Sequence, residues 1–346
     1  MAMASVAPEQ GVKIELAGVK LYFDGTVDRS LHDHLFPPAP PSPSIASSGA
    51  FSKDVPIDST TGVWCRIFLP ESALSSVSDG EVSRLPIVLY FHGGAFVLYS
   101  AASVFYHDEC CKLAARIGAI VISVNYRLAP EHKLPAAFDD GFLALKWLQA
   151  QGNDLGVADP WLSSHADFSK CILMGHSSGA TLLHHAVLTA AAAGSSYLQI
   201  IRGLILGIPF FGGIERTSSE IKYPYSHEIV TASDACWAIS LPDGADRSHP
   251  YCSFLSSQNP DLLQTIQWPP SLVVVGALDP LYDRQIQYVQ HIRKAGHEVT
   301  LKKYAYYGHG IRFPEVTRPE DVDEAYMIMQ EFLTKCFRKF RVVPVT

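Results

Sequence analysis

Short apolar runs recur along the chain, and stretches with helical periodicity separate them. The runs lack polar alternation, which is typical of strands buried on both faces of a parallel sheet; they cover 85–91, 119–124, 170–175, 202–209, 271–276 and 298–304. Stretches with a helical pattern lie at 103–117, 138–151, 178–193, 281–295 and from Pro319 onwards. This alternation predicts an α/β fold, a mostly parallel doubly wound sheet with helices on both faces.

Local signals mark where two of these helices begin. Asp139 or Asp140 is a candidate N-cap for the helix at 138–151, because short acidic side chains accept hydrogen bonds from the first backbone N–H groups. Pro319 is expected at the first position of the last helix, where its missing N–H costs nothing.

The N-terminal part of the chain departs from this rhythm. Residues 1–60 are irregular, with a possible hairpin around Asp24-Gly25. The proline-rich stretch at 37–43 excludes both a helix and a central strand. Alternation over 63–69 then predicts an antiparallel strand with one solvent-facing side.

A second departure lies in the other half of the chain. Residues 210–270 are aromatic and polar but poor in strand pattern, so we expect them to form a cap inserted over the sheet. The aromatic residues Tyr223, Tyr225 and Trp237 are available there for the wall of an apolar pocket. The whole chain, 1–346, is expected to be a single domain that carries these two additions.

The segment KCILMGHSSGAT, residues 170–181, runs from an apolar strand through a tight turn into a helix. Its Gly-x-Ser-x-Gly pattern, from Gly175 to Gly179, is typical of a nucleophile elbow, in which two glycines let the backbone turn sharply and expose the serine hydroxyl. The five residues alone occur by chance in loops, but their flanking strand and helix make Ser177 a candidate nucleophile.

A serine nucleophile needs a histidine base and an acid that orients it. In α/β-hydrolases these follow in the order Ser, Asp, His. Asp279 comes directly after one predicted strand, and His309 lies on a glycine-flanked loop after the next. Asp283 is the alternative acid and His297 the alternative base, but the first would lie one turn into a helix and the second at a surface strand start.

Attack on an ester carbonyl builds negative charge on its oxygen, which fixed N–H donors must stabilise. The sequence His92-Gly93-Gly94-Ala95 follows a buried strand and can present bare backbone N–H groups. We therefore expect Gly93, Gly94 and Ala95 to form an oxyanion hole, which the N–H of Ser178 completes.

Composition excludes several classes of protein. A net charge of −7 gives no electrostatic reason to expect nucleic acid as a partner. The sequence contains no uninterrupted apolar run of about 18 residues, so no membrane span is predicted. Seven irregularly spaced cysteines do not indicate a disulfide framework, so we expect a cytoplasmic protein. We expect it to be a monomer or a homodimer. The pairs His184-His185 and His32 with His34 lack metal-ligand spacing, and packing or exposure explains them.

Longer motifs give the chain a family resemblance. YRLAPEH at 126–132 and PFFGGIERTSSE at 209–220 are distinctive, and they occur together with HGGAF, GHSSGA and the GHG around His309. With these motifs the chain resembles the plant carboxylesterases among the hormone-sensitive-lipase-like α/β-hydrolases. The resemblance implies a serine carboxylesterase that acts on small, largely apolar esters through an acyl-enzyme. It also implies a lid made from residues 1–60 and 210–270, and no cofactor.

The chain departs from that family's usual motifs at three places. Ala95 stands where a third glycine is usual, His176 where Asp is usual, and Ala180-Thr181 where Gly-Asn is usual. His176 could tune the nucleophile beside it and shift the pH profile or acyl preference, but we interpret it as a bystander that faces solvent or the cap. Two other functions of relatives stay open: a lyase that uses the same base and oxyanion hole, and a non-catalytic hormone receptor. His309 argues against a receptor, and a serine at position 177 favours hydrolysis over elimination.

Overall fold

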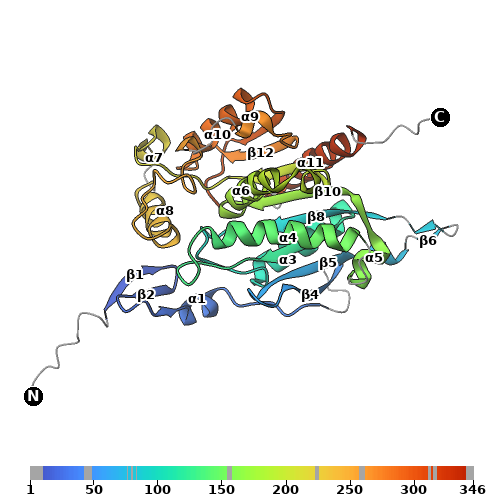
Figure 1. The fold of residues 1–346 in the computed structure, drawn as a ribbon, viewed down its shortest axis with the longest axis horizontal. Coiled ribbons are helices and arrows are strands. Elements are labelled where there is room, and N and C mark those ends of the chain that lie inside the picture. The colour runs from blue at the N-terminus through green and yellow to red at the C-terminus, as the bar shows by residue number, and fades with distance from the viewer. Residues whose placement is uncertain are drawn as a thin grey trace, which may run out of the picture.

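A computed structural model describes residues 11–42, 49–75, 77–78, 81–82, 84–153, 158–222, 226–256, 262–310, 313–314 and 318–339. Its centre is an eight-stranded sheet with the order β13-β12-β11-β10-β8-β9-β5-β4 (Figure 1). The strands are β4 (Ala50–Asp58), β5 (Val63–Pro70), β8 (Leu85–Phe91), β9 (Ile120–Asn125), β10 (Ala166–His176), β11 (Ile201–Gly207), β12 (Ser271–Gly276) and β13 (Val299–Tyr304).

The six strands from β8 to β13 pair in parallel, whereas β5 joins β9 and β4 in antiparallel fashion. All six predicted buried strands are present, which confirms the mostly parallel α/β fold. Parallel strands end at one edge of the sheet, so the loops after β8, β10, β12 and β13 gather there. The candidate site is built from these four loops.

Helices cover both faces of the sheet. Neighbouring residues of a strand face opposite sides: Leu173 of β10 packs in the core with residues of α4, α6 and α10, while Met174 packs with residues of α3 and α11. These helices are α3 (Val104–Ile117), α4 (Ala136–Gly152), α6 (Ser178–Ala193), α10 (Tyr282–Lys294) and α11 (Pro319–Lys339). Pro319 is the first residue of α11, as predicted.

Two local predictions are wrong. The strand at 63–69 has no solvent-facing side, because Arg66 and Phe68 on its second face are as buried as the first face. Neither Asp139 nor Asp140 caps α4, which Pro135 precedes. Asp140 instead accepts hydrogen bonds from the backbone and guanidinium of Arg127, so this carboxylate ties the loop that follows β9 to α4.

The N-terminal segment forms a small sheet of its own, from β1 (Val12–Leu16), β2 (Val19–Tyr22) and β3 (Val27–Asp28), followed by α1 (Ser30–Leu35). The predicted hairpin at Asp24-Gly25 joins β2 to β3. Between β5 and β8 lie only short elements, α2 (Ser72–Ser75), β6 (Val77–Ser78) and β7 (Glu81–Val82). The short helix α5 (Pro160–His165) precedes β10.

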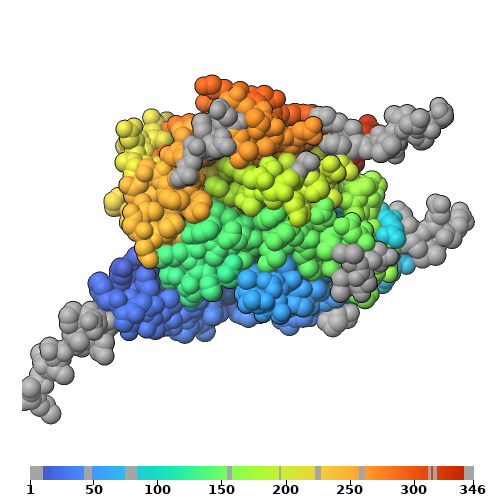
Figure 2. Space-filling model, viewed as in Figure 1, coloured from blue at the N-terminus to red at the C-terminus, as the bar shows by residue number. Residues whose placement is uncertain are grey.

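The inserted segment is helical, with α7 (Ser218–Lys222), α8 (Ser226–Ser240) and α9 (Leu262–Thr265). Helix α8 contacts β1. Figure 2 accordingly shows the blue N-terminal segment and the yellow-to-orange insertion at the same end of the molecule. In the described ranges, no helix is both long and apolar enough to cross a membrane.

Candidate active site

Ser177 lies on a sharp turn between β10 and α6. Its backbone has φ 51° and ψ −118°, a positive φ that L-residues rarely adopt. The flanking glycines allow this turn: a Cβ on Gly175 would lie 2.4 Å from the carbonyl oxygen of Gly179, and one on Gly179 would lie 2.1 Å from that of Phe91. The residues of this pattern therefore form a strained turn that exposes the hydroxyl of Ser177.

The structure brings Ser177, His309 and Asp279 together in one chain of hydrogen bonds. The hydroxyl oxygen of Ser177 lies 2.9 Å from Nε2 of His309, and Nδ1 of His309 lies 2.8 Å from Oδ2 of Asp279. Because a carboxylate only accepts, Nδ1 carries the proton and Nε2 is left to accept from the serine. This is the tautomer that a general base requires.

Asp279 is fully buried and held by two further donors. The backbone N–H of Leu281 donates to Oδ1, and the side-chain amide of Gln285 donates to Oδ2 at 2.7 Å. The alternative residues are engaged elsewhere: Asp283 accepts from the backbone N–H of Ser219, and Nε2 of His297 contacts the carbonyl oxygen of Leu263. The geometry thus favours Asp279 and His309 over both alternatives.

The environment of His309 acts on its pKa in two directions. Burial lowers the pKa, while the charge of Asp279 and the hydrogen bond to it raise it, and the net result is a pKa above the ordinary value. Asp279 therefore favours the protonated form of His309.

The loop after β8 carries bare N–H groups beside the elbow. Gly94 has φ 117°, Ala95 has φ 53° and Phe96 has φ 64°, so the loop turns through three consecutive residues with positive φ. Ser178 is the first residue of α6, where backbone N–H groups lack an acceptor within the helix. The N–H of Gly93, expected as a third donor of the loop, instead donates to the Tyr106 hydroxyl at 2.9 Å.

His92 supports this loop from below. Its ring stacks on Tyr126 with centroids 4.3 Å apart, and its Nδ1–H donates to the carbonyl oxygen of Gly93 at 2.7 Å. Burial lowers the pKa of His92 to about 4, so the ring is neutral near pH 7. The hydroxyl of Tyr126 donates to the backbone carbonyl of His92.

A mostly apolar cavity of about 520 Å³ opens above Ser177 and His309. Leu16 and Ala17 line it from the N-terminal segment, and α8 of the insertion lines it with Ile229, Ala232 and Cys236. No lysine or arginine occurs among the described residues around it. Of the three aromatic residues expected in its wall, Trp237 is buried behind Phe210 with parallel rings 4.8 Å apart, and Tyr223 and Tyr225 lie outside the described residues.

Residues 88–313 match the model of a family described as alpha/beta hydrolase fold. The chain belongs to this family. It is 38% identical to carboxylesterase 20 of Arabidopsis thaliana, over 90% of this chain and 93% of that protein. It is also 40% identical to 3-O-acetylpapaveroxine carboxylesterase CXE1 of Papaver somniferum, over 74% of this chain and 81% of that protein.

Receptors are among the relatives as well. The gibberellin receptor GID1C of Arabidopsis thaliana is 37% identical, over 80% of this chain and 79% of the receptor. Among solved structures, the esterase LipW of Mycobacterium marinum is 25% identical with a TM-score of 0.64, over 84% of this chain and 83% of that one.

In this alpha/beta hydrolase, His176 does not face solvent, and that part of the expectation is wrong, although the residue borders the cavity that α8 of the insertion also lines. Its side chain is 2% exposed and lies on the α3 face of the sheet, the same face as Met174 two residues before it. Nδ1 of His176 lies 2.9 Å from the hydroxyl of Tyr90 and 3.4 Å from a carboxylate oxygen of Glu109. Neither partner was predicted from the sequence.

The other unusual residues after the elbow are also buried. Ala180 is fully enclosed, and the hydroxyl of Thr181 donates to the carbonyl oxygen of Phe210 at 2.6 Å. The backbone N–H of Phe210 in turn donates to the carbonyl oxygen of Ser177. Helix α6 is thereby fastened to the point where the insertion begins.

The remaining histidine pairs pack as expected. His184 contacts the hydroxyl of Tyr288 through Nδ1, and His185 stacks on Phe138 with centroids 4.0 Å apart. His32 is buried, and its Nε2 accepts from the backbone N–H of Tyr99. His34 is exposed.

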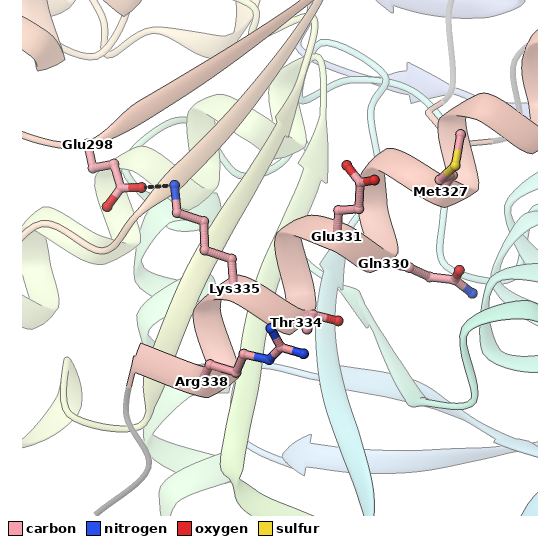
Figure 3. A pocket seen from close by; sticks show the side chains of 7 residues that line it. All are labelled: Glu298, Met327, Gln330, Glu331, Thr334, Lys335 and Arg338. Atoms are coloured by element: carbon pink, nitrogen blue, oxygen red, sulfur yellow. Dashed lines mark ion pairs between the residues drawn. The ribbon is translucent and has the colours of Figure 1, made fainter.

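A second hollow lies on the outer side of α11 (Figure 3). It is shallow, all of its lining residues except Met327 are polar or charged, and an ion pair between Glu298 and Lys335 crosses one end of it. None of the predicted site residues lines it; the lining residues are Glu298, Met327, Gln330, Glu331, Thr334, Lys335 and Arg338. The candidate active site is therefore the apolar cavity above Ser177.

Proposed function

We propose that the protein is a serine carboxylesterase that hydrolyses small, largely apolar esters. The observation that carries this proposal is the continuous hydrogen-bonded chain from Ser177 through His309 to Asp279, at the floor of an apolar cavity. Relatives named as carboxylesterases, at 38% and 40% identity, support the same activity.

In the first half of the reaction, the hydroxyl oxygen of Ser177 attacks the ester carbonyl carbon while its proton passes to Nε2 of His309. The N–H groups of Gly94, Ala95 and Ser178 donate to the oxygen that becomes negative. When the bond to the alcohol oxygen breaks, His309 returns the proton to that oxygen and the alcohol leaves.

In the second half, water attacks the acyl group on Ser177 and gives a proton to His309. The bond to the serine oxygen breaks, that oxygen takes the proton back, and the carboxylic acid is released. Asp279 keeps the same hydrogen bond to His309 in both halves. The backbone N–H of Gly93 donates to the Tyr106 hydroxyl and holds the loop in place, so in this scheme it does not donate to the substrate oxygen.

The cavity also indicates the class of substrate. A carboxylate ligand, such as an acidic hormone, is commonly bound by arginine or lysine, and the described lining contains neither. This favours neutral esters and weighs against an acid-binding receptor. The N-terminal segment and the insertion act in this proposal as the lid that encloses the ester, in a cytoplasmic protein.

Hydrolysis of p-nitrophenyl acetate and butyrate tests the proposal. We expect Ser177→Ala to lower the rate by at least ~10³-fold, because the nucleophile is lost. Ser163→Ala, an exposed serine on α5, is the matched control and should keep the wild-type rate. A wild-type rate no higher than that of Ser177→Ala would rule out the esterase.

Mass spectrometry separates hydrolysis from elimination. A fluorophosphonate should add to Ser177 in the wild type, and an acyl-enzyme on the same residue should be trapped by acid quenching during ester turnover. A lyase would release its product from the same substrate in the Ser177→Ala variant, since proton abstraction by His309 needs no acyl-enzyme.

A further inference from the structure

A buried chain of three polar side chains lies directly behind the nucleophile. The hydroxyl of Tyr90 donates to Oε1 of Glu109 at 3.1 Å and lies 2.9 Å from Nδ1 of His176. The hydroxyl of Tyr90 has a single proton, which it donates to the carboxylate. Its oxygen therefore accepts a hydrogen bond from Nδ1–H of His176. The hydrogen bonds therefore run in one direction, from His176 through Tyr90 to Glu109.

The three residues come from three neighbouring elements. Tyr90 on β8 pairs with Met174 of β10, and His176 ends β10 one residue before the nucleophile. Glu109 lies on α3, which covers this face of the sheet. All three side chains are at most 3% exposed. A carboxylate at this depth is stable only when it is hydrogen-bonded or paired with a cation, and His176 and Tyr90 meet that need.

This chain touches the parts of the site that position the reacting atoms. Gly93 of the oxyanion loop packs so closely that a Cβ there would lie 3.1 Å from the carbonyl oxygen of His176 and 3.3 Å from Cβ of Ser177. The same glycine donates to Tyr106, whose ring lies 6.2 Å from that of Tyr90. A displacement of His176 would therefore shift both the nucleophile and the loop that faces it.

We propose that Glu109, Tyr90 and His176 form a positioning chain, in which the buried carboxylate of α3 holds His176 and, through it, the angle between Ser177 and the oxyanion loop. The inference rests on the proposed esterase function. None of the three residues touches the substrate carbonyl in this scheme. Tyr90 and Glu109 are not among the residues that line the cavity, so loss of either should reduce the rate of acylation and leave ester binding unchanged.

The first test is Tyr90→Phe, which removes one hydroxyl from the middle of the chain. We expect kcat for p-nitrophenyl butyrate to fall about tenfold while KM changes by less than about twofold, since the interaction that is lost acts on the transition state. Tyr304→Phe is the matched control, because the Tyr304 hydroxyl is buried in the same core and has no partner among the described residues. Equal kcat values for the two variants would overturn the positioning role.

The second test places a second carboxylate at one end of the chain. His176→Asp places two carboxylates side by side in the core, so we expect its melting temperature to fall far below that of the wild type. Glu109→Gln should lower the melting temperature of the wild type but raise that of the His176→Asp variant. If Glu109→Gln shifts both backgrounds by the same amount, the two side chains are not coupled and the proposal is wrong.

These readouts separate the inference from the proposed function. Melting temperatures report the pairing without any turnover, and the rate of fluorophosphonate labelling of Ser177 reports its positioning without an ester. A wild type that fails to hydrolyse esters, but is labelled about tenfold faster than Tyr90→Phe, would overturn the esterase and support the chain. Ester hydrolysis with equal labelling of both proteins would do the reverse.

Discussion

Gly179 has the least room of any residue in the elbow. It follows the nucleophile by two positions, and an added Cβ would lie 2.1 Å from the carbonyl oxygen of Phe91. This atom belongs to the backbone of β8, which cannot move without disturbing its ladder with β10. The close approach of α6 to the sheet therefore depends on a hydrogen at this position.

We expect Gly179→Ala to destabilise the fold by about 1–3 kcal/mol or more and to reduce ester hydrolysis together with it, because overpacking forces the backbone to shift. Gly308→Ala is the control for stability: its Cβ would meet only the carbonyl oxygen of Leu278, at 3.7 Å. Urea unfolding measures both variants, and equal midpoints would contradict the packing argument.

The raised pKa of His309 predicts the pH dependence of the reaction. His309 accepts a proton only when neutral, so activity falls as the pH drops through its pKa. Because Asp279 raises that pKa, the acid limb of kcat/KM should have its midpoint above the ordinary value of 6.5. A midpoint below 6.5 would contradict the arrangement described above.

Asp279→Asn tests the cause of that shift. The amide has no charge, so we expect the acid limb to move to lower pH and kcat to fall on the order of 10³- to 10⁴-fold. Asp283→Asn is the matched control, since Asp283 accepts from Ser219 and not from His309. Its acid limb should coincide with that of the wild type in the same assay.

The residues proposed for catalysis were predictable from the sequence because their signals are local. Gly-x-Ser-x-Gly between a strand and a helix locates Ser177, and the order of the two strand ends that follow locates Asp279 and His309. Gln285 was missed although it lies only six residues after Asp279 and donates to it. The contact between Glu109 and His176 was missed for a different reason: the two residues are distant in the sequence, and only the packing of α3 on this face of the sheet brings them together.

At the scale of elements, the wrong prediction for β5 has a physical cause. Alternation of apolar residues normally indicates one wet face, but Arg66 occupies the second face and is 1% exposed. Its guanidinium makes two hydrogen bonds to Asp54 of β4 and one to the carbonyl oxygen of Ala39 in the proline-rich connector. The sequence pattern placed Arg66 on a solvent-facing side of the strand, whereas its side chain joins β4 to the proline-rich stretch.

We expect Arg66→Met to destabilise the protein by about 3 kcal/mol, since removal of one partner of a buried pair leaves the other groups unsatisfied. The size is at the lower end of the usual range because Asp54 is partly exposed. Lys170→Met breaks an exposed pair with Asp167 and should cost at most about 1 kcal/mol. Denaturant unfolding compares the two, and equal losses would show that Arg66 is not a structural link.

At the scale of the whole molecule, the cavity depends on two segments that lie far apart in the sequence. Leu16 and Ala17 precede the sheet, and α8 lies within the insertion after β11, yet they line the same space. The sequence predicted both segments as a lid from family resemblance. It gave no means to tell which side chains of α8 point inward, because the helix is only weakly amphipathic in its sequence.

Ala232 of α8 is a small residue in this lining and offers a test of the lid. We expect Ala232→Phe to fill part of the cavity and to raise KM for p-nitrophenyl butyrate more than for the acetate, because the longer acyl chain needs the lost volume. A small change in kcat for the acetate would show that the catalytic residues are intact. Equal effects on both esters would exclude α8 from the acyl-binding region.

Buried neutral histidines make the fold sensitive to acid. Burial lowers the pKa of His92 to about 4 and that of His185 to about 3, and it lowers the pKa of His184 as well. Below pH 6.5 these histidines are protonated in the unfolded chain but stay neutral in the folded protein. Each of them therefore lowers the free energy of unfolding by about 1.4 kcal/mol per pH unit, until the pH reaches its pKa in the folded protein. The raised pKa of His309 acts in the opposite direction.

We therefore expect the urea midpoint to fall steeply between pH 7 and pH 5. His185→Phe keeps the stacked ring but removes one titrating group, so its midpoint should fall less over the same interval. His34→Gln, at an exposed position, should leave the wild-type slope unchanged. A slope for His185→Phe equal to that of the wild type would contradict this account.

The order of the site along the chain has a consequence for protein synthesis. A ribosome makes the oxyanion loop and the elbow first, and His309 follows Ser177 by 132 residues. A nascent chain therefore carries Ser177 without its base while those 132 residues are added, and a product truncated anywhere before His309 is released without the proton acceptor that would make the serine reactive.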